Sequence, residues 1–244
     1  IDPTYTMGDL ARRRQEIIAT LKAEGVFDLN KSIGIPMFAQ RIAVISSETA
    51  AGYGDFCAQL ADNPYGFQFR TRLFPAVMQG EMVEESIIDA LDSINAEIEE
   101  FDVVVIIRGG GATSDLSGFD TLALAENVAN FPLPVITGIG HDRDESVLDM
   151  ISCVRVKTPT AAADFLISNL AATLAQIEDL GHRLVNHIKE RLSAEKVRIS
   201  ATQTLLPTLY YKRKARETDT ISSLSARMQT ATARRLQSES ARID

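Results

Sequence analysis

Cysteine and long apolar runs are both scarce in this sequence. Cys57 and Cys153 are the only cysteines, and they are too few and too far apart to indicate a disulfide framework or a zinc cluster. No stretch reaches the roughly 18 apolar residues that a membrane span needs, and no charged-then-apolar leader precedes the first predicted helix. These absences lead us to expect a soluble, cytoplasmic protein that makes no contact with a membrane.

Positive charge is scarce as well. The sequence has 33 Asp and Glu residues against 25 Lys and Arg residues, so its formal net charge is -8. A surface that binds nucleic acid everywhere would need clustered Lys and Arg to neutralise phosphates, so any DNA contacts are expected to be local. The remaining composition, 45% hydrophobic and 24% charged over 244 residues, fits one sizeable packed domain with a second element.

The sequence opens on Ile1-Asp2-Pro3 without an initiating methionine, which suggests that a preceding N-terminal module was removed. Residues 9–24 carry apolar side chains at helical spacing, and Gly25 follows where a helix stop is expected. We therefore expect residues 1–30 to be a linker and a helix that lead into the next domain.

Strand and helix patterns alternate over residues 31–157. Short apolar runs predict strands, and amphipathic segments after them predict helices. The predicted pairs are strand 42–46 with helix 50–62, strand 67–74 with helix 81–99, strand 103–107 with helix 120–130, and strand 134–138 with a short helix at 146–150. Four such units predict an α/β domain with a doubly wound, mostly parallel sheet.

Composition changes at Thr158-Pro159, where glycine nearly vanishes and polar helix formers dominate. Thr158 suits a helix cap and Pro159 suits the first helical turn. A narrow apolar seam follows at spacings of three, four and seven, which is typical of long paired helices. The seam consists of Leu170, Leu174, Ile177, Leu184 and Ile188, and it resumes after Pro207 at Ile221, Leu224, Met228 and Ala231.

Residues 158–244 are therefore predicted to be a coiled-coil-like arm, formed by two long helices or one helix kinked at Pro207. One isolated helix cannot bury such a seam. The arm is expected to project from the α/β domain and to pair within the chain or with another chain.

Polar and flexible residues gather where the predicted strands end. The first strand ends in Ser46, Ser47, Glu48 and Thr49, the third in Arg108 with three glycines, and the fourth in Gly140 and His141. Open parallel sheets bind ligands outside the carboxyl ends of their strands, where helix N-termini attract anions. These three loops are therefore expected to converge on one binding edge.

The run Arg108-Gly109-Gly110-Gly111 suits a phosphate group. Glycines let backbone amides approach a phosphate, and a guanidinium can bind its oxygens in bidentate fashion. A tight turn is the competing interpretation, because glycine runs often follow strands for that reason alone. The run matches neither the Walker pattern nor the dinucleotide-binding fingerprint.

His141 lies between a glycine and the carboxylates of Asp142 and Asp144, which suits an imidazole oriented for proton transfer. The alternative is a histidine that is hydrogen-bonded for structure only. His182 and His187 fall on the predicted arm, where we expect them to be solvated residues on a helix face rather than catalytic ones.

Asp55 follows the first strand and, by itself, is more readily interpreted as a helix cap than as a catalyst. Asp55, Asp144 and Asp149 could together hold a divalent cation, but their spacing matches no recognised loop. The cysteines look inert, and no nucleophile elbow is present.

Four ordered motifs resemble the exodeoxyribonuclease VII large subunit family over nearly the whole chain. They are RIAVISSETAAGYGD at 41–55, DVVVIIRGGGATSDL at 102–116, PVITGIGHDRD at 134–144 and VKTPTAAAD at 156–164. The resemblance implies that an OB-fold domain precedes the catalytic domain. It also implies that the helical arm gathers several copies of a small subunit.

The same resemblance implies hydrolysis of single-stranded DNA from either end to short oligonucleotides, with no essential divalent metal or other cofactor. Carried over position by position, the catalytic residues are Asp55, Arg108, His141 and Asp144. The residues expected to bind the substrate are Ser46, Ser47, Thr49, Gly109, Gly110, Gly111 and Thr158.

Two positions depart from the family pattern. Asp142 stands where many relatives carry glutamate, and Glu48 stands where proline or lysine is common. We assign Arg108 and the glycine-loop amides to the phosphoryl charge and His141 to proton transfer, with Asp144 or Asp55 orienting it or the water. Two alternatives remain: a non-enzymatic anion-binding scaffold with an assembly arm, and a small-molecule phosphotransferase or hydrolase.

Overall fold

The fold is taken from a computed structural model of the chain. It describes residues 3–109, 116–140 and 145–243. The chain divides into two compact units, an α/β unit at residues 1–177 and a helical unit at residues 178–244. The division falls later in the chain than the composition change at Thr158, because the first turns of the last helix pack into the core of the α/β unit.

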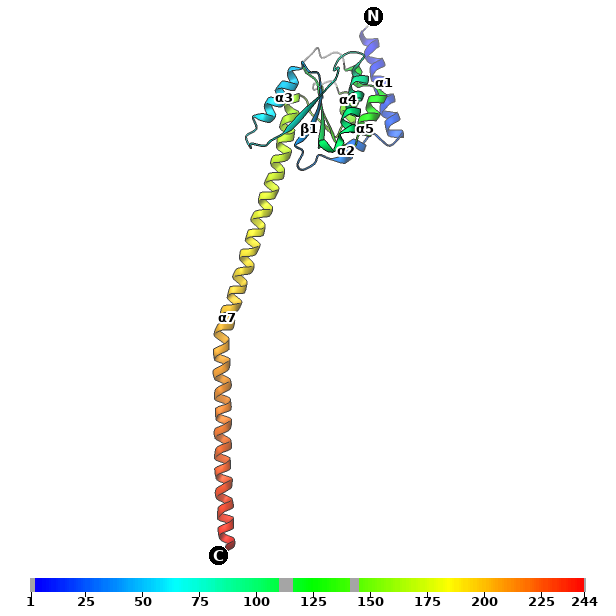
Figure 1. Cartoon of the computed structure of the whole chain (residues 1–244). Coiled ribbons are helices and arrows are strands. Elements are labelled where there is room, and N and C mark those ends of the chain that lie inside the picture. The colour runs from blue at the N-terminus through cyan, green and yellow to red at the C-terminus, as the bar shows by residue number, and fades with distance from the viewer. Residues whose placement is uncertain (1–2, 110–115, 141–144, 244) are drawn as a thin grey trace. The chain divides into compact units, whose positions relative to one another are not determined.

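The α/β unit is built on a five-stranded, all-parallel sheet with strand order β2-β1-β3-β4-β5 (Figure 1). The strands are β1 (Arg41–Ser46), β2 (Arg70–Pro75), β3 (Val103–Ile107), β4 (Val135–Gly138) and β5 (Val154–Arg155). The chain winds first from β1 to β2 on one side and then from β3 to β5 on the other. The predicted doubly wound parallel sheet is therefore confirmed.

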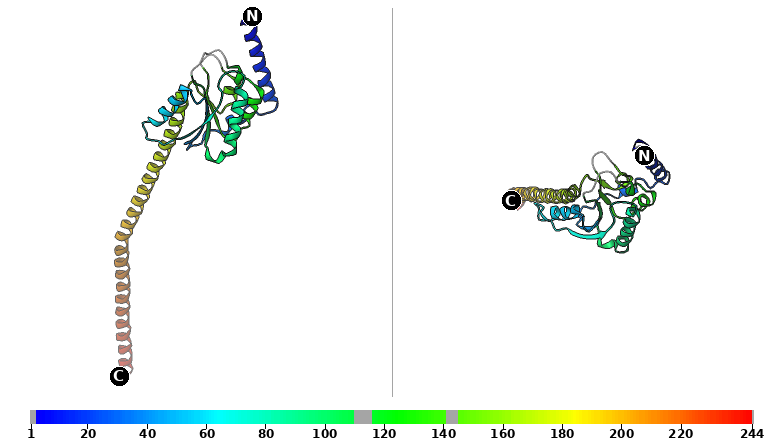
Figure 2. Two further views of the ribbon diagram at one scale, coloured as in Figure 1. Left: turned by 45° about the horizontal axis from the view of Figure 1, so that its top comes forward. Right: turned by 90° about the horizontal axis from the view of Figure 1, so that it is seen from above.

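Helices cover both faces of this sheet (Figure 2). One face packs against α1 (Pro3–Ala23), α4 (Val83–Ala96), α5 (Leu122–Ala129) and α6 (Val147–Ile151). The other face packs against α3 (Ala51–Ala61) and the first turns of α7 (Pro159–Ile243). The central strands are apolar toward both layers: in β1, Ala43 and Ile45 face the first layer, whereas Ile42 and Val44 face the second.

The second strand begins later than predicted, at Arg70 rather than at residue 67. The side chain of Asn63 both donates to the carbonyl oxygen of Phe67 and accepts from its N–H, each at 2.9 Å. Those bonds hold Phe67 in the turn before the strand. The sequence did not predict β5, since two residues give no measurable alternation.

The helix predicted at 81–99 is shorter in the structure, where α4 ends at Ala96 and a 3₁₀ turn, η1, occupies Ile98–Glu100. The helix predicted at 120–130 begins at Leu122, after a second 3₁₀ turn, η2, at Ser117–Phe119. The helices predicted at 50–62 and 146–150 are confirmed as α3 and α6.

A short helix that the sequence did not reveal, α2 (Leu29–Ile33), brings Asn30 into the core. The Asn30 amide donates to the carbonyl oxygens of Phe131 and Leu133 and accepts from the N–H groups of Val135 and Cys153. One buried side chain thereby ties the start of β4 to the segment before β5.

The predicted arm is a single helix, α7, which continues through Pro207 without a break. This outcome decides between the two alternatives of one helix or two. Every described side chain from Leu174 to Arg242 is exposed, including the seam residues Leu184, Ile188, Leu224 and Met228. Within the described part of the chain, no helix is long and apolar enough to cross a membrane.

Candidate active site

The winding of the sheet changes direction between β1 and β3, and this is where open α/β sheets bind their ligands. The two strands are paired in parallel, with Ile45 opposite Ile106. Their carboxyl ends therefore bring Ser46 and Ser47 beside the segment that begins with Arg108. Two of the three predicted loops meet at this carboxyl edge.

The loop after β1 begins inside the protein and ends at the surface. Ser46 is fully buried, its carbonyl oxygen accepts from the N–H of Ala76 at 2.9 Å, and its hydroxyl has no hydrogen-bond partner among the described residues. The Ser47 and Thr49 hydroxyls lie 3.4 Å apart, and Thr49 is exposed. Ser47 and Thr49 thus have surface access, whereas the Ser46 hydroxyl faces the interior.

Gly109 occupies a position where a side chain does not fit. A Cβ atom there would lie 2.5 Å from the Cβ of Ala50 and 2.9 Å from its Cα. The backbone after β3 therefore passes in direct contact with the backbone before α3. Close packing of two loops is the physical reason for this glycine, and it holds Arg108 next to the loop after β1.

Arg108 is half-buried, and its backbone N–H donates to the carbonyl oxygen of Gly138 at 3.3 Å. Its position is thus set by β4 on one side and by the Ala50–Gly109 contact on the other. Gly110 and Gly111, which were also expected to bind the substrate, lie outside the described residues.

Asp55 lies on α3 and its side chain is exposed. The N-cap residue of this helix is Ala50, so the interpretation of Asp55 as a helix cap is wrong. Gly52, three residues earlier, would place a Cβ 3.1 Å from the Cα of Gly109. Since residues three apart share a side of a helix, Asp55 lies one turn along α3 from the carboxyl edge.

The start of α7 reaches the same edge. The Thr158 hydroxyl accepts from the N–H of Ala161 at 3.1 Å, which confirms the predicted cap. A Cβ on Gly52 would lie 2.8 Å from Cγ of Pro159, and a Cβ on Gly138 would lie 3.2 Å from the carbonyl oxygen of Thr158. The Thr158 backbone thus packs against the end of β4 and Pro159 against the start of α3, and Thr158 itself is exposed.

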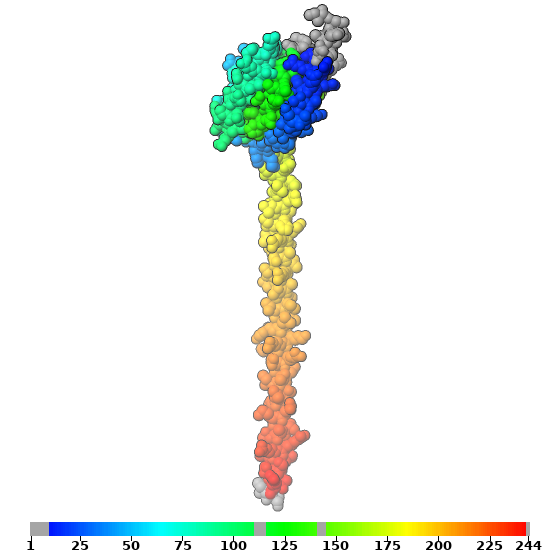
Figure 3. Space-filling model, turned by 90° about the vertical axis from the view of Figure 1, so that its right-hand side faces the viewer, coloured from blue at the N-terminus to red at the C-terminus, as the bar shows by residue number. Residues whose placement is uncertain are grey.

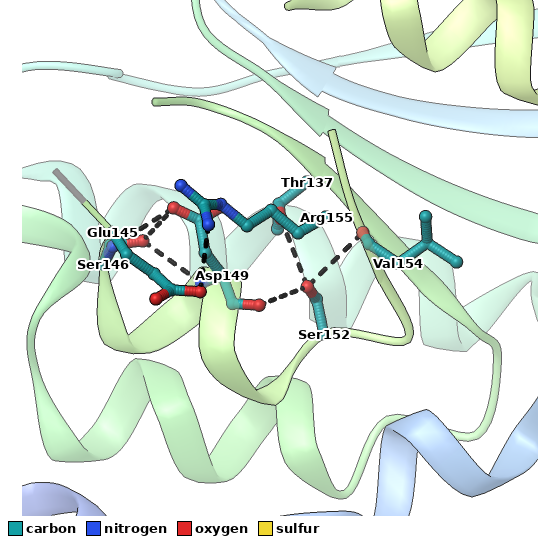
Figure 4. Close-up of polar contacts among 7 residues, drawn as sticks. All are labelled: Thr137, Glu145, Ser146, Asp149, Ser152, Val154 and Arg155. Atoms are coloured by element: carbon teal, nitrogen blue, oxygen red, sulfur yellow. Dashed lines mark hydrogen bonds and ion pairs between the residues drawn. The ribbon is translucent and has the colours of Figure 1, made fainter. Parts of the chain in front are cut away.

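His141, Asp142 and Asp144 lie outside the described residues, so the expected convergence of Arg108 and His141 stays a prediction. The residues directly after that segment are held by several bonds (Figure 4). Glu145 pairs with Arg155 at 3.1 Å, and the Ser146 hydroxyl accepts from the N–H of Asp149 in a capping box.

Asp149 is the third member of the carboxylate set that the sequence offered as a metal site, together with Asp55 and Asp144. Its Oδ2 instead accepts from the N–H and hydroxyl of Ser146, at 3.1 and 2.8 Å. Asp149 and Asp55 also lie on helices that cover opposite faces of the sheet. Asp144 lies outside the described residues, so the three-carboxylate interpretation is not tested, but the bonds of Asp149 argue against it. Across the described ranges, no group of three or more His, Cys, Asp or Glu residues could hold a metal ion.

Sequence reasoning missed the polar residues that support the ends of β4 and β5. The Thr137 and Ser152 hydroxyls are buried and lie 3.1 Å apart, and Ser152 also donates to the carbonyl oxygen of Asp149. Asp120, predicted to begin a helix, is a buried carboxylate paired with Arg14. A lone polar residue in an apolar stretch was the only available signal for any of them.

The fold and this edge together define a doubly wound α/β protein with a candidate phosphate-binding site at its switch point. The chain belongs to the exonuclease VII large subunit family, since it matches the family described as "Exonuclease VII, large subunit" over residues 26–244. α1 lies before the matched residues.

Curated relatives bear the name "Exodeoxyribonuclease 7 large subunit". The chain is 36% identical to the one from Deinococcus radiodurans over 181 residues, which is 73% of this chain and 44% of the relative. It is 40% identical to the one from Nostoc sp. over 166 residues, 68% of this chain and 39% of the relative. With the relative from Lactobacillus helveticus the identity is 31% over 217 residues, 87% of this chain and 48% of the relative. The chain thus spans less than half the length of these relatives.

Proposed function

We propose that the chain is the catalytic part of an exodeoxyribonuclease that hydrolyses phosphodiester bonds of single-stranded DNA, from either end, to short oligonucleotides. The observation that carries this proposal is the meeting of the loops after β1 and β3 at the switch point, where Gly109 packs against Ala50. Family membership supports the choice of substrate, because the relatives are named as exodeoxyribonuclease subunits.

Hydrolysis of a phosphodiester needs charge stabilisation on the phosphoryl oxygens, an activated water and a proton for the leaving oxygen. In this proposal Arg108, which follows β3, meets the phosphoryl charge together with the backbone amides of the glycine run. His141 transfers protons, and Asp144 or Asp55 orients either the imidazole or the water. Thr49 and Thr158, both exposed at the carboxyl edge, contact the DNA backbone.

The relatives' name, a large subunit, supports a small-subunit partner. In this proposal several copies of that partner bind the seam of α7, whose apolar side chains are exposed throughout the helical unit. The few, unpaired cysteines support a cytoplasmic site of action.

The proposed reaction does not depend on a divalent cation. The test is degradation of end-labelled single-stranded DNA by the full-length protein with its small subunit, with and without excess chelator. Release of short oligonucleotides in both conditions is the expected result. Loss of all activity with chelator would overturn the metal-independent reaction.

The same assay separates the alternatives. A scaffold that only binds anions would retain the labelled DNA without shortening it. A phosphotransferase or hydrolase for small molecules would leave the DNA intact and unbound while consuming a nucleotide or phosphate monoester. Either result would overturn the proposal of a nuclease.

A further inference from the structure

A buried carboxylate, Asp120, joins two parts of the α/β unit that are far apart in the sequence. Its side chain is only 2% exposed. Oδ1 accepts from the backbone N–H of Val147 at 2.7 Å, and Oδ2 accepts from Nε of Arg14. Each oxygen of one carboxylate therefore serves a different helix, α6 on one side and α1 on the other.

The second of these helices, α1, lies beside the segment that carries α5, as the blue and green regions of Figure 3 show. Ile17 and Leu21 pack into the core cluster, which fixes the helix by apolar contact. The Arg14–Asp120 pair adds a directional contact, since a guanidinium and a carboxylate bond only in particular orientations.

Burial makes this pair different from the other charged contacts of α1. Burial raises the pKa of Asp120, while the Val147 N–H and Arg14 act to lower it. A carboxylate with little access to water depends on its partners, so removing Arg14 leaves an uncompensated charge inside the protein. The exposed Arg12–Glu16 pair on the same helix carries no such cost.

The start of α6 is the point at which this contact bears on function. Val147 is the first residue of α6, and only Glu145 and Ser146 separate it from the segment that contains His141 and Asp144. Glu145–Arg155 and the Ser146–Asp149 capping box bind this start to neighbouring parts of the same chain segment. The hydrogen bond from Val147 to Asp120 links this start to Arg14 on α1, in addition to the apolar packing of the two helices.

We infer that Asp120 is a positioning residue, which couples the docking of α1 to turnover at the carboxyl edge by holding Arg14 and the first N–H of α6 with one carboxylate. The inference rests on the proposed function, because it requires His141 or Asp144 to act in the reaction. It assigns a role to α1, which precedes the residues that match the family.

The test compares Asp120→Asn, Arg14→Gln and the double variant in the full-length protein with its small subunit. The asparagine keeps an oxygen acceptor for Val147 and loses the charge that holds Arg14. We expect kcat on a single-stranded oligonucleotide to fall about tenfold in each single variant, with KM changed less than about twofold, as for loss of a transition-state interaction. The double variant should be no slower than the slower single variant, because both changes break one contact.

Arg12→Gln is the matched control, since it removes the same charge from the same helix at a side chain that is 78% exposed. Its kcat should equal that of the wild type. All variants are assayed below their melting temperatures, which separates loss of positioning from loss of folded protein. If Asp120→Asn does not fold, Arg14→Gln decides alone, because Arg14 lies at the surface edge of the pair.

Unchanged kcat in folded Arg14→Gln or Asp120→Asn protein, additive losses in the double variant, or an equal loss in Arg12→Gln would overturn the inference. Failure of the proposed function has a different signature. In that case the wild-type protein would not degrade single-stranded DNA, or His141→Ala would retain full activity.

Discussion

The two stretches of α7 share one helix but have opposite surroundings. In the α/β unit, Ala162, Ala163 and Leu166 are fully buried against the second face of the sheet. In the helical unit every described side chain is exposed, and Leu184 is 61% exposed. Apolar periodicity therefore shows that a helix needs a partner surface. Whether that partner is the sheet of the same chain cannot be read from the periodicity.

The side chains themselves explain the difference. The first stretch has small residues that let the helix approach the sheet closely, and its apolar stripe is wide enough to cover several strands. The second stretch has only a narrow seam, which matches another helix rather than a sheet. The α/β unit thus completes its own core, whereas the helical unit leaves its apolar seam exposed.

The comparison is tested most strongly by changes that abolish turnover without affecting assembly. His141→Ala should lower turnover roughly a hundredfold or more with DNA affinity nearly unchanged, because a proton-transfer group acts mainly as the bond breaks. Arg108→Ala should weaken both binding and turnover, because a guanidinium on a phosphate acts in the ground and transition states alike. Single-turnover rates and equilibrium binding of labelled DNA measure the two quantities.

The control for contaminating nuclease is the double variant of His141 and Arg108, purified in parallel. Any activity in that preparation comes from a contaminant. Full activity in His141→Ala would reduce His141 to a structural residue and move proton transfer to Asp55 or Asp144. Light scattering should give wild-type mass for both single variants.

The converse change should affect assembly and leave the α/β unit intact. The seam variant, Leu184→Asp with Ile188→Asp, should weaken small-subunit binding at least about tenfold, because charges cannot enter an apolar helix seam. Mass from light scattering and the melting temperature of the α/β unit are the two measurements.

Asn186→Asp with Ser193→Asp provides the matched control for the seam variant. Asn186 is two residues from Leu184 and from Ile188, about 200° around the helix, so it lies on the opposite side. The control should assemble normally. A wild-type mass for the seam variant, or a monomer for the control, would mean that the seam is not the assembly surface.

Two glycines sharpen the contrast further. Gly109→Ala should destabilise the protein by about 1–3 kcal/mol, because overpacking against backbone forces the two loops apart. A Cβ added at Gly181, within α7, would meet no described atom of another element within 4 Å, so Gly181→Ala should stabilise the helix by about 1 kcal/mol. Thermal unfolding of both variants measures the two changes in stability, which should have opposite signs. Destabilisation by Gly181→Ala would mean that the helical unit packs closely there.

The smallest expected effect concerns Asp102, which pairs with Arg41 at the other end of β3. Burial acts to raise the pKa of Asp102, but hydrogen bonds from Arg41 and Gln40 outweigh it and lower the pKa overall. The charged Asp102 carboxylate therefore stabilises the folded protein above the carboxyl's ordinary pKa, about 4. This stabilisation is lost as the pH falls through the lowered pKa of Asp102 in the folded state.

Asp102→Asn should accordingly cost about 1–2 kcal/mol at pH 7 and less at pH 2, because protonation of the wild-type carboxyl removes the same contribution as the pH falls. Urea unfolding at the two pH values measures the difference. Asp92→Asn, at an exposed position on α4, is the control and should match the wild type at both. An equal loss for Asp102→Asn at both pH values would show that shape rather than charge matters there.

Much of this architecture could be predicted from local sequence patterns. The runs at 42–46 and 103–107 are apolar on both faces, and only a central parallel strand buries both. Ordered strands and helices then place Ser47 and Arg108 at one edge without further information. The cap at Thr158 was equally readable, because a threonine before a proline and an apolar run is a local signal.

Other features depend on residues that are distant in the sequence. The interpretation of Asp55 as a cap was wrong because the helix start is set by the loop that packs on Gly109. The role of Asn30 follows from four backbone groups at 131–153, and that of Asp120 from Arg14. Nothing in the neighbouring residues of either side chain predicts such partners.

The sequence by itself determined the alternation of strands and helices, the edge at which the strands end and the narrow seam of α7, since each follows from periodicity and local turn chemistry. Only the tertiary structure decided that Gly109 is required by contact with Ala50 and that Asp120 holds two helices. It also decided that the first turns of α7 pack into the core while the later turns leave the seam exposed. The physical reason is that close approach and burial depend on which surfaces meet, and one-dimensional spacing does not specify which surfaces meet.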